Sequence, residues 1–306
     1  MLSKIFKAPF VAWNHFFHRQ ADLSIFGPIR IAYATLMLIN VLAWWPNLEK
    51  WFDENGVMTL AVSKMIIDPD TITMFQWLPT TPAVVWTCYL ILIFALVNVL
   101  LGCLTRLNLF VVFVMFASFA HRNNLIFDGE DVMFRLFTFY LIFTPVGQYL
   151  SLPVWLKQRK EKSQVARSSL RAIWPLRLIQ IQTSCVLLFS GLEKLRGEEW
   201  LDGTAIYYVS RLDDMFYRFP VPEFLFESLT WIAIITWSTI ALEISLPLAV
   251  WIPKTRKYAL GLVILFHLSL DYMMSLNLFQ WIMIVGWMSF IERRQITEAI
   301  DKPNSE

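Results

Sequence analysis

Charged residues are scarce in this chain of 306 residues. They make up 16% of the sequence, against about a quarter in ordinary soluble domains, whereas 57% of the residues are hydrophobic. The 26 Lys and Arg nearly balance the 24 Asp and Glu, so the formal net charge is only +2. This composition excludes a disordered chain and a typical cytosolic enzyme, and without a broad basic surplus it predicts no nucleic-acid partner.

Cysteine is also rare, and the first residues show no cleavage site of the kind that follows a signal peptide. The three cysteines, Cys88, Cys103 and Cys185, lie inside apolar runs and form no C-x-x-C or Cys/His spacing. We therefore expect neither a disulfide framework nor a metal site. The first 20 residues mix Phe and Trp with Lys and His and contain no small-residue cleavage site, which favours an interfacial amphipathic segment over a signal peptide.

Long apolar stretches are what the sequence has in abundance. A bilayer core of about 30 Å needs about 20 mostly apolar residues per helix. Eight stretches, of which the third and the last two are short, lie near residues 25–46, 82–102, 107–121, 132–150, 174–192, 229–251, 258–273 and 276–291. Because they show no alternation of period two, the sequence predicts an all-α, polytopic membrane helix bundle of about 8 transmembrane helices, with seven or nine left open.

The distribution of Lys and Arg predicts an N-in and C-in orientation. With that orientation the cytoplasmic segments hold 16 of the 26 basic residues and the outer segments hold 7. The outer segments 47–81 and 193–228 are long for connections between packed helices, and we expect both to fold over the outer mouth of the bundle. The predicted domains are the amphipathic segment 1–20, a transmembrane domain 21–295 and a cytoplasmic tail 296–306.

Two charged residues inside the apolar stretches are predicted to meet. Arg30 lies in the inner half of the first stretch and Glu243 in the inner half of the sixth. An ionisable group in the bilayer costs about 2.5–3.5 kcal/mol on insertion scales, so each is expected to have a partner. Depth alone predicts an Arg30–Glu243 ion pair, which serves either as a structural clamp or as part of a proton or head-group path.

Polar side chains gather where the third stretch ends and the fourth begins. They are His121, Arg122, Asn123, Asn124, Glu130, Asp131 and Arg135. The helix macrodipole favours carboxylates at a helix N-terminus, so Glu130 and Asp131 are either helix caps or part of a polar cavity. Arg135 follows Asp131 by four residues, which predicts a pair on one helix face.

A lysine and a histidine are the two candidate catalytic side chains. Lys194 ends the fifth stretch, with Trp200 shortly after it. These two residues are either a snorkelling anchor and an aromatic-belt residue, or a general base in apolar surroundings that penalise its charged form. His267, four residues before Asp271, is either a core histidine or a catalyst. No zinc-binding spacing or nucleophile elbow accompanies them.

Four separated pieces of the sequence occur in an order that resembles a known family. They are Phe26–Ile31; His121–Asn124 with Gly129–Asp131; Gln180–Gln182 with Ser190–Leu195 and Trp200–Ala205; and Glu243 and Pro247 followed by Phe266-His267. Together they resemble the HTTM (horizontally transferred transmembrane) domain family, which is related to the membrane domain of vitamin K-dependent γ-glutamyl carboxylase. The resemblance covers about residues 20 to 295.

The resemblance implies an integral membrane enzyme with carboxylase-like, quinol-linked lyase chemistry. A reduced vitamin K or menaquinone-type quinol is deprotonated by a lysine and reacts with O₂ to give a base that removes the γ-proton of a glutamate, and the carbanion takes up CO₂. The implied catalytic residues are Lys194 and His267, without a metal. The implied substrate- or quinol-binding residues are His121, Arg122, Asn123, Asn124, Asp131, Arg135 and Trp200.

The resemblance also implies the partners and leaves a second function open. The expected partners are the lipid bilayer, an isoprenoid quinone and an exported peptide or protein, with the site on the extracytoplasmic side of a bacterial cytoplasmic membrane. The alternative is a non-catalytic accessory membrane protein in peptide toxin maturation or export. A small-molecule transporter is disfavoured because the sequence shows no inverted repeat and no paired broken helices.

Overall fold

The computed structural model describes residues 2–66, 71–161, 170–212, 215–216 and 218–291, and these form two compact units, Met1–Arg177 and Leu178–Glu306. Most described residues are helical, which confirms the predicted class in its main feature. The predicted cytoplasmic tail 296–306 lies outside the described residues.

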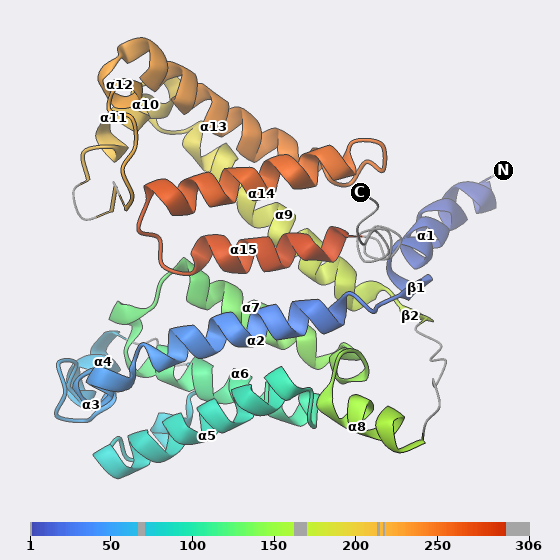
Figure 1. Cartoon of the computed structure of the whole chain (residues 1–306), viewed down its shortest axis with the longest axis vertical. Coiled ribbons are helices and arrows are strands. Elements are labelled where there is room, and N and C mark those ends of the chain that lie inside the picture. Colours follow the sequence, from blue (N-terminus) through green and yellow to red (C-terminus); the bar gives the residue numbers. More distant parts are fainter. Residues whose placement is uncertain (1, 67–70, 162–169, 213–214, 217, 292–306) are drawn as a thin grey trace, which may run out of the picture. The chain divides into compact units, whose positions relative to one another are not determined.

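The first unit is an up-and-down bundle in which α2 packs on α5, α5 on α6 and α6 on α7 (Figure 1). Its helices and strands are α1 (Leu2–His18), β1 (Gln20–Asp22), α2 (Phe26–Leu42), α3 (Leu48–Phe52), α4 (Leu60–Ile66), α5 (Pro82–Leu101), α6 (Thr105–Arg122), α7 (Gly129–Ile142), α8 (Leu152–Glu161), β2 (Leu170–Ala172) and the start of α9 (Trp174–Lys194). The two three-residue strands pair antiparallel, with Gln20 opposite Ala172. This short ladder, which a local apolar pattern cannot reveal, departs from the predicted all-α description.

Arg30 fastens one end of this bundle. Its side chain is fully buried, and its Nη1 donates to the carbonyl oxygens of Val146 (2.8 Å) and Tyr149 (3.0 Å). Its Nη2 donates to the carbonyl of Leu150 at 2.7 Å. The structure gives both members of the predicted Arg30–Glu243 ion pair other partners within their own units, main-chain carbonyls after α7 for Arg30 and a lysine for Glu243.

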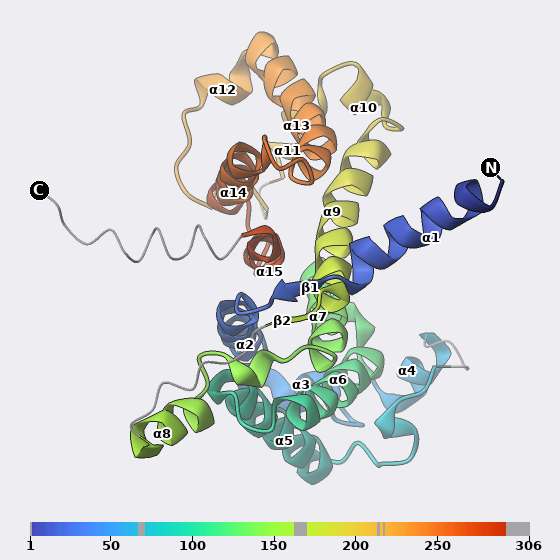
Figure 2. The ribbon, with the colours of Figure 1, turned by 90° about the vertical axis from the view of Figure 1, so that its right-hand side faces the viewer.

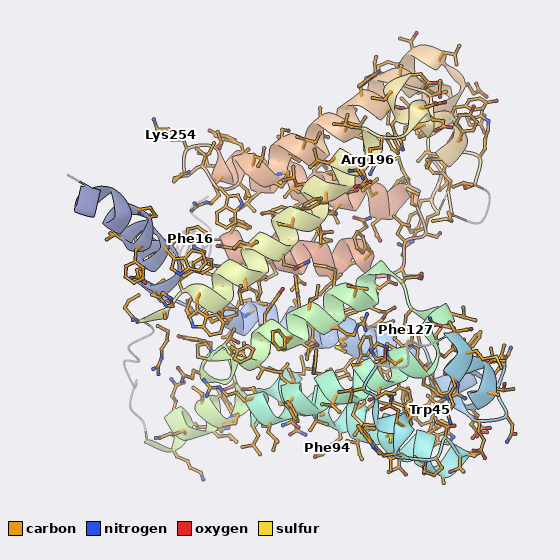
Figure 3. The ribbon with its side chains drawn as sticks, turned by 180° about the vertical axis from the view of Figure 1, so that it is seen from behind. Phe16, Trp45, Phe94, Phe127, Arg196 and Lys254 are labelled. Carbon is orange, nitrogen blue, oxygen red and sulfur yellow. The ribbon has the colours of Figure 1, made fainter. Side chains whose placement is uncertain are left out.

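An aromatic cluster closes the other end of the first unit. Trp44 stacks on Phe116 with ring centroids 5.6 Å apart, and its ring also lies 5.5 Å from that of Phe127. Phe52 of α3 packs edge-on against Phe119 of α6 at 4.8 Å. Figure 3 shows Phe127 among the side chains at this end. The described parts of segment 47–81 are thus held against the end of α6 by aromatic packing.

Where the second unit is described, it contains the rest of α9 and six further α-helices. They are α10 (Glu198–Leu201), α11 (Ala205–Val209), α12 (Phe224–Glu227), α13 (Leu229–Ala249), α14 (Arg256–Met273) and α15 (Phe279–Trp287). α13 packs on α14 and α14 on α15, and both views show these neighbours side by side (Figures 1 and 2). The short helices α11 and α12 pack on α13.

A helix occupies each of the eight apolar ranges predicted from the sequence. Four helical segments are long and apolar enough to cross a membrane: Phe26–Phe52, Pro82–Leu101, Trp174–Lys194 and Leu229–Ala249. The pair Gly129–Ile142 and Val146–Lys160, bent by 71°, adds a fifth if it forms one span. α14 carries Arg256, Lys257 and Asp271, and α15 has only nine residues. The count of eight spans and the N-in and C-in orientation stay predictions.

Gly102 provides a test of the packing at the Arg30 end. It ends α5 with φ +80°, and a Cβ atom there would overlap Ser151 Cβ and lie 2.6 Å from Arg30 Nη1. We expect Gly102→Ala to destabilise the protein by about 2–4 kcal/mol, from left-handed backbone strain and overpacking together. The measurement is the thermal unfolding midpoint of the detergent-purified variant.

The matched control is Gly261→Ala in α14, where an added Cβ meets nothing within 4 Å. This control should unfold at the wild-type temperature or slightly above it, because Ala favours helix over Gly. Equal midpoints for the two variants would contradict the packing described for Gly102.

Candidate functional site

Lys194, at the end of α9, contacts two polar side chains. Its Nζ donates to Glu243 Oε2 at 2.7 Å and to Ser190 Oγ at 2.9 Å. The same amine lies 5.0 Å from the centroid of the Trp200 ring, at cation–π distance. The Lys194 side chain is 20% exposed and that of Glu243 6%, so the ion pair is largely removed from solvent. Arg196, two residues further along the chain, is labelled in Figure 3.

The packing of α9 on α13 explains why this pair forms. A Cβ at Gly191 would lie 2.9 Å from Ile244 Cγ1 and 3.0 Å from Glu243 Cβ, so the two helices approach closely there. Seven residues before Gly191 on α9 and seven residues after Ile244, just past the end of α13, Trp251 Nε1 donates to Ser184 Oγ at 3.0 Å. The equal spacing gives an antiparallel register, and Lys194, three residues after Gly191, is thereby brought to Glu243.

In this register the Lys194–Glu243 pair lies well inside the length of α13 and not at one of its ends. Glu243 follows Leu229 by 14 residues, or about 21 Å at 1.5 Å per residue, so the first part of α13 extends past the end of α9. α11 and α12 pack on that extension through an apolar cluster of Ile206, Phe216, Phe226 and Ile232. Lys194 is therefore the last residue of α9, but it lies beside the second half of α13.

The geometry allows the pair to exchange a proton. Nζ and Oε2 are at hydrogen-bond distance, and moving one proton between them interconverts ammonium–carboxylate and amine–carboxylic acid forms. Buried charges are stable only when they are paired and hydrogen-bonded, a condition that Ser190 and Glu243 meet here. The arrangement can therefore hold a proton next to an indole face.

His267 has a different environment. It is 1% exposed, and its Nδ1 lies 2.5 Å from Gln280 Oε1. Its Nε2 is 3.0 Å from Trp287 Nε1, which can only donate, so Nε2 accepts and the ring proton lies on Nδ1. Both ring nitrogens are thus occupied within the core. This geometry favours the core-histidine interpretation over the catalytic one.

Asp271 forms an ion pair with Arg218 and not with His267, although Asp271 and His267 share a helix face. Arg218 Nη1 donates to Asp271 Oδ1 at 2.7 Å, and Phe216, two residues before this arginine, forms an isolated antiparallel bridge with Met274. The described part of segment 193–228 is therefore fastened to the end of α14 as well as to α13.

Two of the predicted binding residues in the first unit hold the outer segment 47–81. Arg122 is 1% exposed, and its Nη2 donates to the carbonyls of Asp53 (2.6 Å) and Met58 (3.0 Å). Asn123 donates to the Trp51 carbonyl at 2.9 Å and accepts from the Leu125 N–H. These contacts give both residues a structural role at the end of α6.

Asp131 caps α7 and contacts α2. Its Oδ2 accepts from the Asp128 N–H at 2.8 Å, and its Oδ1 accepts from Asn40 Nδ2 at 2.7 Å. The carboxylate therefore bonds to Asp128 and Asn40, and the positive charge of Arg135, four residues further along α7, also acts on it, as the predicted pairing on one helix face requires. Glu130 is buried in the same turn. His121 and Arg135 are half-buried, and Asn124 is exposed.

The structure brings together only part of the predicted site. Lys194 and Trp200 meet in the second unit, joined by Glu243, which the sequence had assigned to another partner. Sequence reasoning missed Ser190 as a contact of Lys194, although the i,i+4 spacing was readable. It also missed the partners of the other polar residues, which come from distant segments: Asn40, Arg218, Gln280 and Trp287.

Removing one member of the buried pair should destabilise the protein. We expect Glu243→Gln to lower the free energy of unfolding by about 1–3 kcal/mol, because the Lys194 charge loses its counter-ion in largely desolvated surroundings. The measurement is the thermal midpoint of the purified variant at low and high salt.

The exposed ion pair between Glu193 and Arg196 provides the control. Its side chains are 61% and 78% exposed, so Glu193→Gln should leave the midpoint unchanged. The double variant Lys194→Met/Glu243→Leu should recover much of the lost stability because no charge stays unpaired. A midpoint for Glu243→Gln that matches Glu193→Gln would refute the buried pair.

Comparison with known proteins identifies the family. The HTTM domain model matches residues 18–294, and the chain therefore belongs to the HTTM domain family. The chain is also 35% identical over 96 residues to the sporulation-delaying protein SdpB of Bacillus subtilis (strain 168). That similarity covers 30% of this chain and 29% of SdpB, so the chain matches less than a third of the relative's length. No solved structure matches the chain.

Proposed function

We propose that this HTTM protein is a membrane enzyme of the vitamin K-dependent carboxylase-like type, in which Lys194 and Glu243 handle the proton of a lipid-borne quinol. The observation that supports this most directly is the 2.7 Å contact between Nζ and Oε2 beside the Trp200 ring. Lys194 is also the residue that the family resemblance implies as the base.

The surroundings of Lys194 fit an isoprenoid quinol. The amine is partly accessible, and exposed leucines stand near it in sequence at Leu192, Leu195 and Leu201. A hydroxylated ring could lie against the Trp200 face with its hydroxyl near Nζ, and its tail could stay in lipid. Bound there, a reduced quinol would supply the reducing equivalents and, with O₂, the base strength that γ-carboxylation of a glutamate by CO₂ requires.

The protein's own residues would then act on protons. Lys194, in its amine form, accepts a proton from a hydroxyl at the site, and Glu243 stabilises the ammonium that results. Ser190 orients the amine from the preceding helical turn. A general base that is positioned in this way contributes typically 10²–10⁴-fold to a rate.

The remaining predicted residues have supporting roles in this proposal. His267 would position α14 against α15 through Gln280 and Trp287 and would not contact the reacting atoms. Arg122, Asn123 and Asp131 would order the end of the first unit, and His121, Asn124 and Arg135 stay candidates for substrate contact. The proposal includes eight spans, N-in and C-in, in a bacterial cytoplasmic membrane with the site on the extracytoplasmic side.

A carboxylation assay tests the enzymatic proposal. Protein in lipid nanodiscs is given reduced menaquinone, O₂, ¹⁴C-bicarbonate and a Glu-containing peptide. We expect quinol oxidation coupled to incorporation of label. Lys194→Ala should lose at least 100-fold of this activity, because the base is removed, and Glu193→Gln should keep it.

Absence of both quinol oxidation and label incorporation in wild-type protein, next to an active carboxylase as positive control, would refute the enzymatic proposal. Equal activity of Lys194→Ala and wild type would refute the role given to the lysine.

The alternative is an accessory function in peptide toxin maturation or export. The observation that favours it is the 35% identity with the sporulation-delaying protein SdpB over 96 residues. In that case the Lys194–Glu243 pair is structural, and Lys194→Met/Glu243→Leu should preserve the amount of mature exported peptide in the producing cells. Loss of the mature peptide in this variant at normal membrane abundance would count against a purely accessory role.

A further inference from the structure

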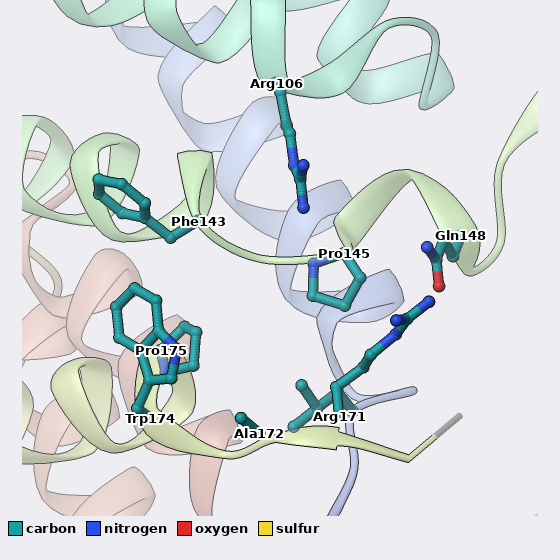
Figure 4. A pocket seen from close by; sticks show the side chains of 9 residues that line it. Arg106, Phe143, Pro145, Gln148, Arg171, Ala172, Trp174 and Pro175 are labelled. Atoms are coloured by element: carbon teal, nitrogen blue, oxygen red, sulfur yellow. The ribbon is translucent and has the colours of Figure 1, made fainter. Parts of the chain in front are cut away.

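A basic cavity lies at one end of the first unit. Its volume is about 400 Å³, and it opens where α7 ends and α6 and α9 begin. Arg106, on the first turn of α6, and Arg171, on β2, line it from different elements, and Figure 4 shows the Arg106 guanidinium above Pro145 and the Arg171 guanidinium beside Gln148. Phe143 and Trp174 form the other side of the cavity, with ring centroids 5.6 Å apart.

The charged residues that line the cavity are both positive. None of the nine residues that line it is acidic. Within the described part of the chain neither arginine forms an ion pair. Two arginines that line the same cavity are suited to the oxygens of a phosphate group, to which arginine binds with charge-assisted hydrogen bonds.

An apolar groove continues from the same place. A second cavity of about 660 Å³ shares Arg106, Pro145 and Gln148 with the first. Leu104 and Leu107 line it and are 76% and 60% exposed. A ligand that fills both spaces must therefore combine an anionic group with an apolar chain.

The position of the cavities corresponds to a membrane interface. They lie at the helix ends of the bundle, next to α8, whose exposed face carries Trp155 with Arg159 stacked on it at 5.3 Å. Exposed tryptophan beside basic residues is typical of the head-group level, and basic pockets between membrane helices bind anionic lipid head groups.

We propose that this cavity binds an anionic phospholipid, with the phosphate between Arg106 and Arg171 and an acyl chain along Leu104 and Leu107. The site is separate from Lys194 and does not depend on the proposed enzymatic function. An ordered lipid here would fix β2 and the first turn of α9 against α6 and the end of α7.

A titration with short-chain lipids tests the proposal. Dihexanoyl-phosphatidylglycerol, dihexanoyl-phosphatidylcholine and inorganic phosphate are each added to the full-length protein in mild detergent, and binding is followed by calorimetry. We expect saturable binding of phosphatidylglycerol only. Arg106→Gln and Arg171→Gln should each weaken it about fivefold, since one basic side chain contributes about 1 kcal/mol at a membrane surface.

Arg159→Gln is the matched control, because this arginine is exposed on α8 at the same end but does not line either cavity. It should bind phosphatidylglycerol like wild type, and Arg171→Lys should retain part of the affinity. Equal binding of both lipids, or an equal loss in Arg159→Gln, would overturn the proposal. Inorganic phosphate that binds as tightly as phosphatidylglycerol would indicate a free-anion site and would also overturn it.

Discussion

The second unit depends on one constraint: two opposite charges in largely apolar surroundings must meet. Each ionisable group carried into a bilayer costs about 2.5–3.5 kcal/mol on insertion scales, so Lys194 and Glu243 strongly favour the helix register that joins them. Gly191 makes this register sterically accessible because it lets α9 approach α13 closely. The extension of α13 beyond α9, and the packing of α11 and α12 on that extension, follow from the same register.

In the first unit, buried charged side chains are paired with main-chain carbonyls instead of with a side chain of opposite charge. Arg30 and Arg122 donate to main-chain carbonyls in the segments that follow α7 and α3, at opposite ends of the bundle. A main-chain carbonyl accepts a hydrogen bond from a guanidinium group but does not take its proton. We therefore assign these two arginines a structural role, in which they hold the two segments in place. A lysine against a carboxylate can both stabilise a fold and transfer a proton. This difference in chemistry is why the candidate site is placed at Lys194 although the first unit has more polar residues.

Sequence reasoning found the helices because apolar length is a local signal. All eight predicted apolar ranges contain helices, and Asp131 was correctly considered as a helix cap because capping depends on neighbours in the chain. The partners of Arg30, His267 and Glu243 could not be predicted, since they depend on the register between helices and on segments more than ten residues away. The β1–β2 pairing was missed for the same reason, because two three-residue strands about 150 residues apart carry no periodic pattern.

The most direct test of the account is a measurement on the Lys194 amine itself. In protein labelled with ¹⁵N at lysine side chains, the Nζ resonance of Lys194, assigned by its loss in Lys194→Met, reports the contact with the carboxylate. Because Glu243 is the counter-ion of this amine, we expect the resonance to shift strongly in Glu243→Gln and to stay in place in Glu193→Gln. An Nζ resonance that is unchanged by Glu243→Gln, or that equals that of a solvent-exposed lysine, would contradict the account.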